Sequence, residues 1–222
     1  MMAFQKKILM VVTNHDHIDA THPTGLWLEE YAAPYQEFLA AGFDVVVASP
    51  KGGISPIDPR SLSGEIPKQW QAAATRLQTT EALAGLDFQK FDAIVIPGGH
   101  GPLFDLANNE VLAKSLQHFA TAGKIIGAVC HGPAGLVSAT LPDGTPFVAG
   151  KKLTAFSNAE EKIVQLDQLV PFLLEDKLKS LGAEYVSDKP WATHVVVDGK
   201  LVTGQNPQSS SAFAKALVAL LQ

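Results

Sequence analysis

Four short runs of apolar, largely β-branched residues stand out along the first 130 positions of the chain. Each run spans six residues, and polar or turn-forming residues bound it on both sides. Continuous apolar runs of this length predict strands that are buried on both faces, as in a parallel sheet. The predicted strands cover residues 7–12, 43–48, 91–96 and 124–129.

Helical patterns separate these runs. Residues 26–41 carry apolar side chains close to a 3.6-residue spacing, and Gly42 follows as a typical helix stop. Pro34 lies inside this segment and should kink or divide the helix. Residues 111–122 repeat the pattern and end before Gly123.

The second half of the chain gives weaker signals and one strong one. Two β runs flank Asp198-Gly199 within residues 195–203, which predicts a hairpin. Further predictions are a helix over 130–139, a short strand over 153–156, and helices over 171–181 and 209–221. Residues 50–78 read as an insertion that could cover a site.

Alternating strands and helices predict a doubly wound α/β fold. We expect a mostly parallel central sheet with helices on both faces, built from residues 1–222 as a single domain. Sites in such sheets form at the carboxyl ends of the strands. Residues 13–24, residues 97–102 and the pair Cys130-His131 all fall there.

Composition narrows the classes of function. The 222 residues are 46 % hydrophobic and 18 % charged, with a net charge of −5, which argues against a general nucleic-acid or anionic-membrane surface. A single cysteine makes no internal disulfide, so a reducing, cytoplasmic setting is expected. The apolar run near the N-terminus reads as a first strand rather than a signal peptide, and no run approaches the ~18 residues of a membrane span.

That single cysteine, Cys130, directly follows the predicted strand 124–129. Small residues lie two positions away on either side, Ala128 before it and Gly132 after it. This is the pattern of a nucleophile elbow, a tight strand-to-helix turn that presents one side chain. A helix N-terminus facing the thiol would favour the reactive thiolate. The competing interpretation is a buried structural cysteine in a core strand.

Other candidate groups lie at the same sheet edge. Gly98 and Gly99 precede His100, and consecutive glycines let backbone N–H groups bind an oxyanion. Either Glu29 or Glu30 could face the site from its helix, but adjacent helical residues point about 100° apart. A desolvated carboxyl there could stay protonated and shuttle protons.

His131 could act as a base on the thiol if a carboxylate orients it, and Glu160 and Glu161 are candidates for that role. The alternative for these glutamates is that they stabilise the first turn of a helix. A loop cluster also offers zinc ligands, although without a strong ligand spacing. It consists of His15, Asp16, His17 and His22.

Taken together, the segments Cys130-His131-Gly132-Pro133-Ala134, Pro97-Gly98-Gly99-His100-Gly101, and Thr24-Gly25 with the acids after it resemble the DJ-1/PfpI (ThiJ) superfamily, in its Hsp31-like branch. The likeness extends over nearly the whole chain. It implies a flavodoxin-like α/β sandwich, usually a homodimer.

The resemblance also implies an activity: cofactor-independent glyoxalase III chemistry, which turns a small 2-oxoaldehyde such as methylglyoxal into a 2-hydroxy acid without glutathione. Other activities assigned in the family are holdase chaperoning of unfolded clients, protein deglycation, and cysteine amidase or peptidase activity. Carried over by motif, Cys130 is the nucleophile, His131 the base, Glu30 the acid and Glu161 the orienting carboxylate. Gly98, Gly99 and His100 then serve substrate and oxyanion binding, with no metal.

Overall fold

The computed structural model describes residues 5–222, and its centre is a seven-stranded sheet. The strand order is β10-β11-β7-β6-β1-β4-β5, and every neighbouring pair is parallel except β10 with β11. The bounds are β1 Lys7–Val11, β4 Asp44–Ser49, β5 Glu81–Ala82, β6 Ala93–Ile96, β7 Ile125–Val129, β10 Val195–Asp198 and β11 Leu201–Gly204. The four strands predicted in the first half and the hairpin at Asp198-Gly199 are confirmed.

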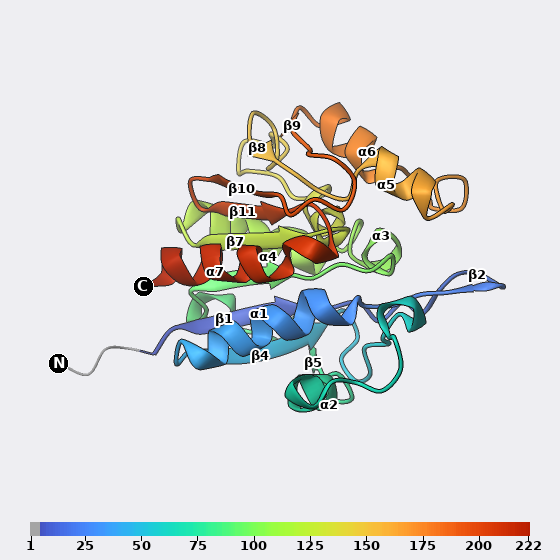
Figure 1. Ribbon diagram of the computed structural model, residues 1–222. Helices are drawn as coiled ribbons and strands as arrows, with labels where there is room; N and C mark the ends of the chain where they lie inside the picture. The colour runs from blue at the N-terminus through green and yellow to red at the C-terminus, as the bar shows by residue number, and fades with distance from the viewer. Residues whose placement is uncertain (1–4) are drawn as a thin grey trace.

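Helices cover both faces of this sheet (Figure 1). On one face α1 (Leu28–Ala40) and α7 (Ser210–Leu221) lie side by side. On the other face α4 (Glu110–Thr121) packs against β6 and β7. The predicted flavodoxin-like α/β sandwich is confirmed.

The central strands feed two separate cores because successive side chains point to opposite faces. In β1, Ile8 and Met10 pack with α1 and α7, while Leu9 and Val11 pack with α4. All four side chains are fully buried. Burial on both faces explains why these strands read as unbroken apolar runs.

Smaller elements complete the chain. They are β2 (His17–Asp19), β3 (His22–Pro23), α2 (Gln71–Arg76), α3 (Pro102–Asp105), β8 (Lys152–Leu153), α5 (Asn158–Ile163), α6 (Leu174–Ser180) and β9 (Glu184–Tyr185). Short 3₁₀ turns cover Pro59–Ser61, Lys68–Trp70, Leu83–Gly85, Phe88–Lys90, Gly132–Leu136 and Pro207–Ser209. Within residues 5–222 no helix is long and apolar enough to cross a membrane.

Two predictions of local structure were wrong, and one of the two alternatives predicted for Pro34 was also wrong. The segment after Cys130 forms only the 3₁₀ turn Gly132–Leu136 instead of a helix to 139. Pro34 lies inside one continuous helix, which tolerates a single missing N–H donor here, so it does not divide the segment. The strand expected over 153–156 shrinks to β8, which pairs with β9 outside the main sheet.

Gly132 lies where two strand ends meet with no room for a side chain. A Cβ built on Gly132 would lie 2.0 Å from the carbonyl oxygen of Ile96, which is backbone and cannot rotate away. The turn after β7 therefore packs backbone against backbone on the end of β6.

We predict that Gly132→Ala lowers the free energy of unfolding by about 2 kcal/mol or more, because the added methyl forces the two strand ends apart. Gly85→Ala is the matched control, since a Cβ there meets nothing within 4 Å, and it should change stability by less than about 0.5 kcal/mol. Chemical denaturation of both variants checks this. Equal stability of the two would contradict the close approach.

Candidate active site

Cys130 lies at the sharp turn that follows β7. Its φ angle is +59°, a left-handed conformation that few residues other than glycine adopt. Its N–H donates to the carbonyl oxygen of Gly204 at 2.9 Å, and its carbonyl oxygen accepts from the N–H of Phe156 at 2.9 Å. The elbow geometry is thus present, and two other segments of the chain hold it through these hydrogen bonds.

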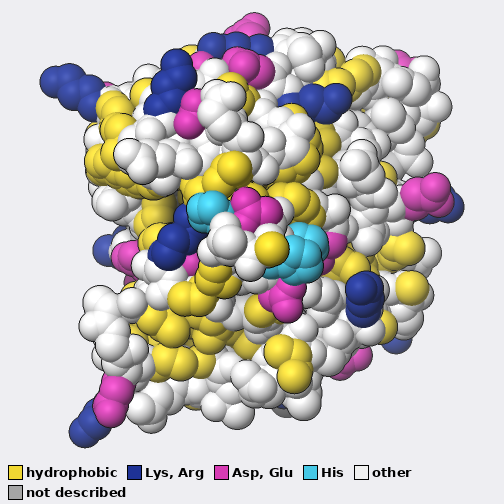
Figure 2. Space-filling view, turned by 90° about the vertical axis from the view of Figure 1, so that its right-hand side faces the viewer, with side chains coloured by type: hydrophobic (Ala, Val, Ile, Leu, Met, Phe, Trp, Pro, Cys, Tyr) yellow, Lys and Arg dark blue, Asp and Glu magenta, His cyan; other side chains and the backbone are white. Residues whose placement is uncertain are grey.

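The thiol borders a cavity of about 590 Å³ at the carboxyl end of the sheet. Figure 2 faces this end of the molecule, where histidine and acidic side chains gather among hydrophobic ones. The lining residues come from eight separate stretches of the chain and are mostly aromatic, small or polar. They are Trp27, Glu29, Arg60, Ser61, Gly99, His100, Cys130, His131, Phe156, Val164, Trp191, Pro207 and Gln208. Arg60 and Ser61 show that the insertion 50–78 reaches the site.

His131 connects the thiol to a carboxylate. Its Nδ1 lies 3.5 Å from Cys130 Sγ, and its Nε2 lies 2.6 Å from Glu161 Oε2. All three side chains are buried. Because an ionised carboxylate only accepts hydrogen bonds, His131 Nε2 carries a proton, and Nδ1 of the neutral ring is left to accept one from the thiol.

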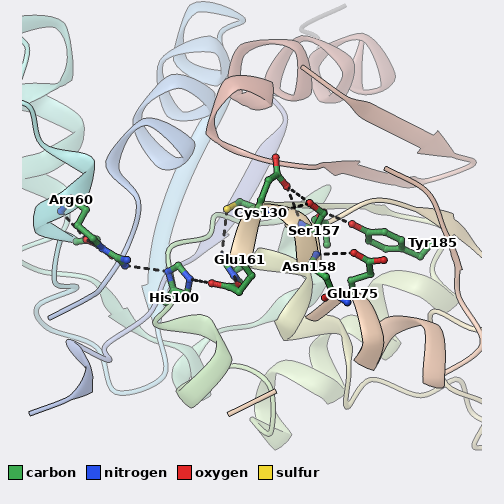
Figure 3. A network of polar contacts seen from close by, with 12 residues as sticks. Arg60, His100, Cys130, Ser157, Asn158, Glu161, Glu175 and Tyr185 are labelled. Carbon is green, nitrogen blue, oxygen red and sulfur yellow. Dashed lines mark hydrogen bonds and ion pairs between the residues drawn. The ribbon is translucent and has the colours of Figure 1, made fainter. Parts of the chain in front are cut away.

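Glu161 serves a second histidine with its other oxygen. His100 Nε2 lies 2.6 Å from Glu161 Oε1, and Arg60 Nη2 lies 3.1 Å from His100 Nδ1 (Figure 3). Arg60 is in turn held by Asp58, with Nη2 2.5 Å from Oδ2. Both ring nitrogens of His100 are therefore engaged with protein groups rather than free for a substrate.

The protonation of Glu161 and His100 follows from their burial and from the interactions between neighbouring side chains. The two histidines beside Glu161 hold the pKa of that carboxyl well below its usual range, even though burial alone would raise it. Burial and the neighbouring His131 lower the pKa of His100 to about 4. Near neutral pH Glu161 is therefore a carboxylate and His100 is neutral.

Glu30 approaches Cys130 from the first turn of α1. Its Oε2 accepts a hydrogen bond from the N–H of Gly98 at 2.7 Å, and its Oε1 has no hydrogen-bond partner within residues 5–222. The side chain is completely buried, and this burial raises the pKa of Glu30 well above its usual value. Glu30 is thereby suited to hold a proton beside the thiol.

The expected help from a helix N-terminus at Cys130 is not found. The segment that follows is a five-residue 3₁₀ turn, and burial raises the pKa of the thiol, with the negative charge of Glu30 raising it further when ionised. Formation of the thiolate therefore depends on a proton acceptor, His131, and on Glu30 remaining protonated.

The structure separates the two pairs of adjacent glutamates. Glu29 is half-buried at the cavity wall, whereas Glu30 points to Gly98 and Cys130. Glu160 faces away from His131. Its carboxylate forms a capping box with Ser157 and accepts bonds from the N–H of Trp191 and from Asn206 Nδ2, at 2.9 and 2.8 Å.

The glycine loop after β6 presents backbone N–H groups to the cavity. Gly99 adopts a φ of +88°, and a Cβ there would lie 2.1 Å from the carbonyl oxygen of Gly25. Within residues 5–222 the N–H groups of Gly99 and His131 donate no hydrogen bond to another protein group. They are the donors available to an oxyanion in this cavity.

The donor set for a metal differs from the one considered from the sequence. In the described part of the chain, the group whose ligand atoms lie within 4.8 Å of one another is His100, His131 and Glu161. Their facing atoms are already joined by two hydrogen bonds of 2.6 Å. In the loop, His17 pairs with Asp16 and His22 with Asp19, so the structure does not gather that cluster around one point.

Sequence reasoning did not find Arg60, the aromatic side chains Phe156 and Trp191 that line the cavity, or the contact of Glu161 with His100. Arg60 comes from the insertion, and Phe156 and Trp191 come from distant segments, with ring centroids 5.7 Å apart. Residues this far apart in the sequence show no regular spacing that would link them. The one signal in the sequence was that residues 50–78 read as an insertion that could cover a site.

Comparison with known proteins gives a consistent picture. A model of the DJ-1/PfpI family matches residues 23–220. The glutathione-independent glyoxalase hsp3101 of Schizosaccharomyces pombe is 30 % identical, with 100 % of this chain and 98 % of that protein covered. Among solved structures, Rapid Encystment Protein 24 KDa of Francisella tularensis has a TM-score of 0.93 and 36 % identity, covering 98 % of this chain and 100 % of that chain. Glyoxalase III from Candida albicans has a TM-score of 0.85 and 28 % identity, covering 96 % of each chain.

The buried acid Glu30 predicts a specific pH dependence of stability. Because folding raises its pKa, the folded state binds an extra proton between the ordinary glutamate pKa and the raised value, so stability falls as pH rises through that range. The loss amounts to about 1.4 kcal/mol for each unit by which the pKa is raised.

In Glu30→Gln this part of the pH dependence should vanish. The free energy of unfolding of the variant should therefore rise relative to that of the wild type from pH 4 to pH 8. Urea unfolding at a series of pH values measures it. Glu29→Gln, one residue away and only half-buried, should show a much smaller effect of the same sign. Parallel curves for wild type and Glu30→Gln would mean that the carboxyl is not held protonated.

Proposed function

The chain belongs to the DJ-1/PfpI family, and we propose that it is a glutathione-independent glyoxalase that converts methylglyoxal and water to lactate through Cys130. One observation supports this most strongly. The row Cys130–His131–Glu161 is hydrogen-bonded at an elbow in a cavity, with the buried acid Glu30 beside the thiol. Full-length relatives that bear the name of this activity agree with it.

His131 activates the nucleophile. Its free Nδ1 takes the thiol proton, and the imidazolium that forms is stabilised by the ionised Glu161 at 2.6 Å from Nε2. The buried carboxylate compensates for the cost of creating a charge in an apolar setting. The thiolate then adds to the aldehyde carbon and gives a hemithioacetal.

The oxygen of the attacked carbonyl gains negative charge in this step. Gly99 and His131 line the cavity, their N–H groups have no acceptor within residues 5–222, and these groups can donate to this oxygen. Glu30, whose pKa is raised by burial so that the protonated form is favoured, can supply a proton to it. A carboxylate at that position would instead repel the developing charge.

The remaining steps transfer a proton and add water. Removal of the proton on the former aldehyde carbon gives an enediol, and reprotonation at the neighbouring carbon gives a thioester of the 2-hydroxy acid. Water then cleaves the thioester, returns the thiol and releases lactate. Methylglyoxal and water thus balance lactate, with no external oxidant or reductant.

We predict that purified protein forms lactate from methylglyoxal without glutathione or added metal. Cys130→Ala should lower kcat by on the order of 10⁴-fold, since no other group replaces the covalent step. Glu30→Gln should cost on the order of 10²-fold by removing the proton donor. Glu29→Gln is the matched control on the same helix and should change kcat far less.

Two outcomes would redirect the assignment. Lactate formation that persists in Cys130→Ala would exclude the thiol mechanism. Absence of turnover in the wild type, with Cys130 titrated as a free thiol, would exclude the glyoxalase. Cleavage of small amide substrates would then favour a cysteine amidase or peptidase, and suppression of client aggregation would favour a holdase.

A further inference from the structure

His100 occupies a position that the proposed chemistry does not yet use. It is 4 % exposed, and its ring lies 4.0 Å from that of His131, centroid to centroid. Both rings point a nitrogen at the same carboxylate, Glu161, at 2.6 Å. A nucleophile, a base and one orienting carboxylate would suffice for thiol activation, so the second histidine calls for an explanation.

The donors and acceptors around His100 allow only one neutral tautomer. Arg60 can only donate, so Nδ1 must accept from its Nη2 at 3.1 Å. The ionised Glu161 can only accept, so Nε2 must carry the proton that it receives. The direction of every hydrogen bond from Arg60 to Glu161 is thereby fixed.

The guanidinium of Arg60 is itself held in place by Asp58. Asp58 accepts from Arg60 Nε at 3.0 Å, from Arg60 Nη2 at 2.5 Å and from the Arg60 backbone N–H at 2.8 Å, and it also accepts a hydrogen bond of 2.9 Å from Thr24 Oγ1. Asp58 is completely buried. Because Asp58 neutralises the guanidinium, Arg60 is poorly suited to bind an anionic substrate group and well suited to donate to His100.

We propose that Arg60 and His100 are positioning residues that hold Glu161 in the orientation required by His131. This inference rests on the proposed role of Cys130 as nucleophile. A carboxylate held through one oxygen only can rotate about its C–C bond, whereas donors on both oxygens fix its plane. His100 therefore acts through Glu161 and His131, not on the substrate.

The other charged groups near this row do not replace His100. The negative charges of Glu30 and Glu160 disfavour the thiolate, and the hydrogen bonds of these two side chains go to Gly98, Ser157, Trp191 and Asn206 rather than to Glu161. Of the residues described, Glu161 takes side-chain hydrogen bonds from His100 and His131. Loss of His100 leaves one oxygen of a buried carboxylate without a partner.

Two substitutions separate the two contacts of His100. In His100→Gln the amide nitrogen reaches toward the former Nε2 and keeps a donor for Glu161. In His100→Asn the shorter side chain places an acceptor near the former Nδ1, keeps the contact with Arg60 and loses Glu161. His118→Asn, on α4, controls for the loss of a histidine elsewhere.

The decisive readout is the pH dependence of Cys130 alkylation by iodoacetamide, which needs no turnover of methylglyoxal. In His100→Asn the midpoint should move upward by on the order of one pH unit, since the imidazolium of His131 loses its fixed partner. His100→Gln should restore most of that shift, and Arg60→Met should move the midpoint in the same upward direction. His118→Asn should overlay the wild type.

Kinetics and spectroscopy complete the test. In His100→Asn kcat for methylglyoxal should fall at least about 10-fold with KM changed less than about 3-fold, and His100→Gln should recover most of it. Two-bond ¹H–¹⁵N NMR of the wild type should show His100 as the neutral Nε2–H tautomer.

An alkylation midpoint that stays in place or moves downward in His100→Asn would overturn the proposal, as would an Nδ1–H tautomer of His100. Absence of turnover in the wild type would instead contradict the glyoxalase assignment, and the alkylation profile would still decide the role of His100.

Discussion

The close approach of two strand ends is the constraint on which the site depends. The turn after β7 and the glycine loop after β6 pack backbone against backbone, with no space for a Cβ at Gly98 or Gly132. This contact forces Cys130 into a left-handed conformation and aims its thiol at the cavity. It also brings the backbone N of His131 within 2.7 Å of where a Cβ on Gly98 would lie, so one steric constraint positions the proposed nucleophile beside the proposed oxyanion donors.

Around this elbow the protein divides two buried carboxyl groups by their environment. Glu161 receives donors from two histidines, which favour its ionised form, while Glu30 receives one backbone N–H and its burial favours the protonated form. The different number of donors suits Glu161 to the proposed role of orienting a base and Glu30 to the proposed role of supplying a proton. The same division makes the thiol dependent on His131, because burial disfavours its anion.

Much of the fold could be predicted from the chain alone. Residues such as Ile8 and Leu9 must both be buried if β1 lies between two helical layers, so an unbroken apolar run identified a central strand. The 3₁₀ turn after Cys130 could not be predicted, because Gly132, Pro133 and Gly135 are compatible with several turns. The packing of Gly132 against Ile96 selected among them.

The sequence by itself determined the chemistry on offer: one thiol in a small-residue turn, a histidine after it, a glycine loop at the next strand end and two pairs of adjacent glutamates. The spacing of residues along a short stretch of sequence predicts which of them lie on the same helix, strand or turn. Only the tertiary structure decided which glutamate of each pair approaches Cys130 or His131, because two adjacent helical residues point about 100° apart and the neighbouring elements determine which direction leads to these side chains. It likewise joined Arg60 to His100 and His100 to Glu161, contacts spanning 40 and 61 positions that no local pattern encodes.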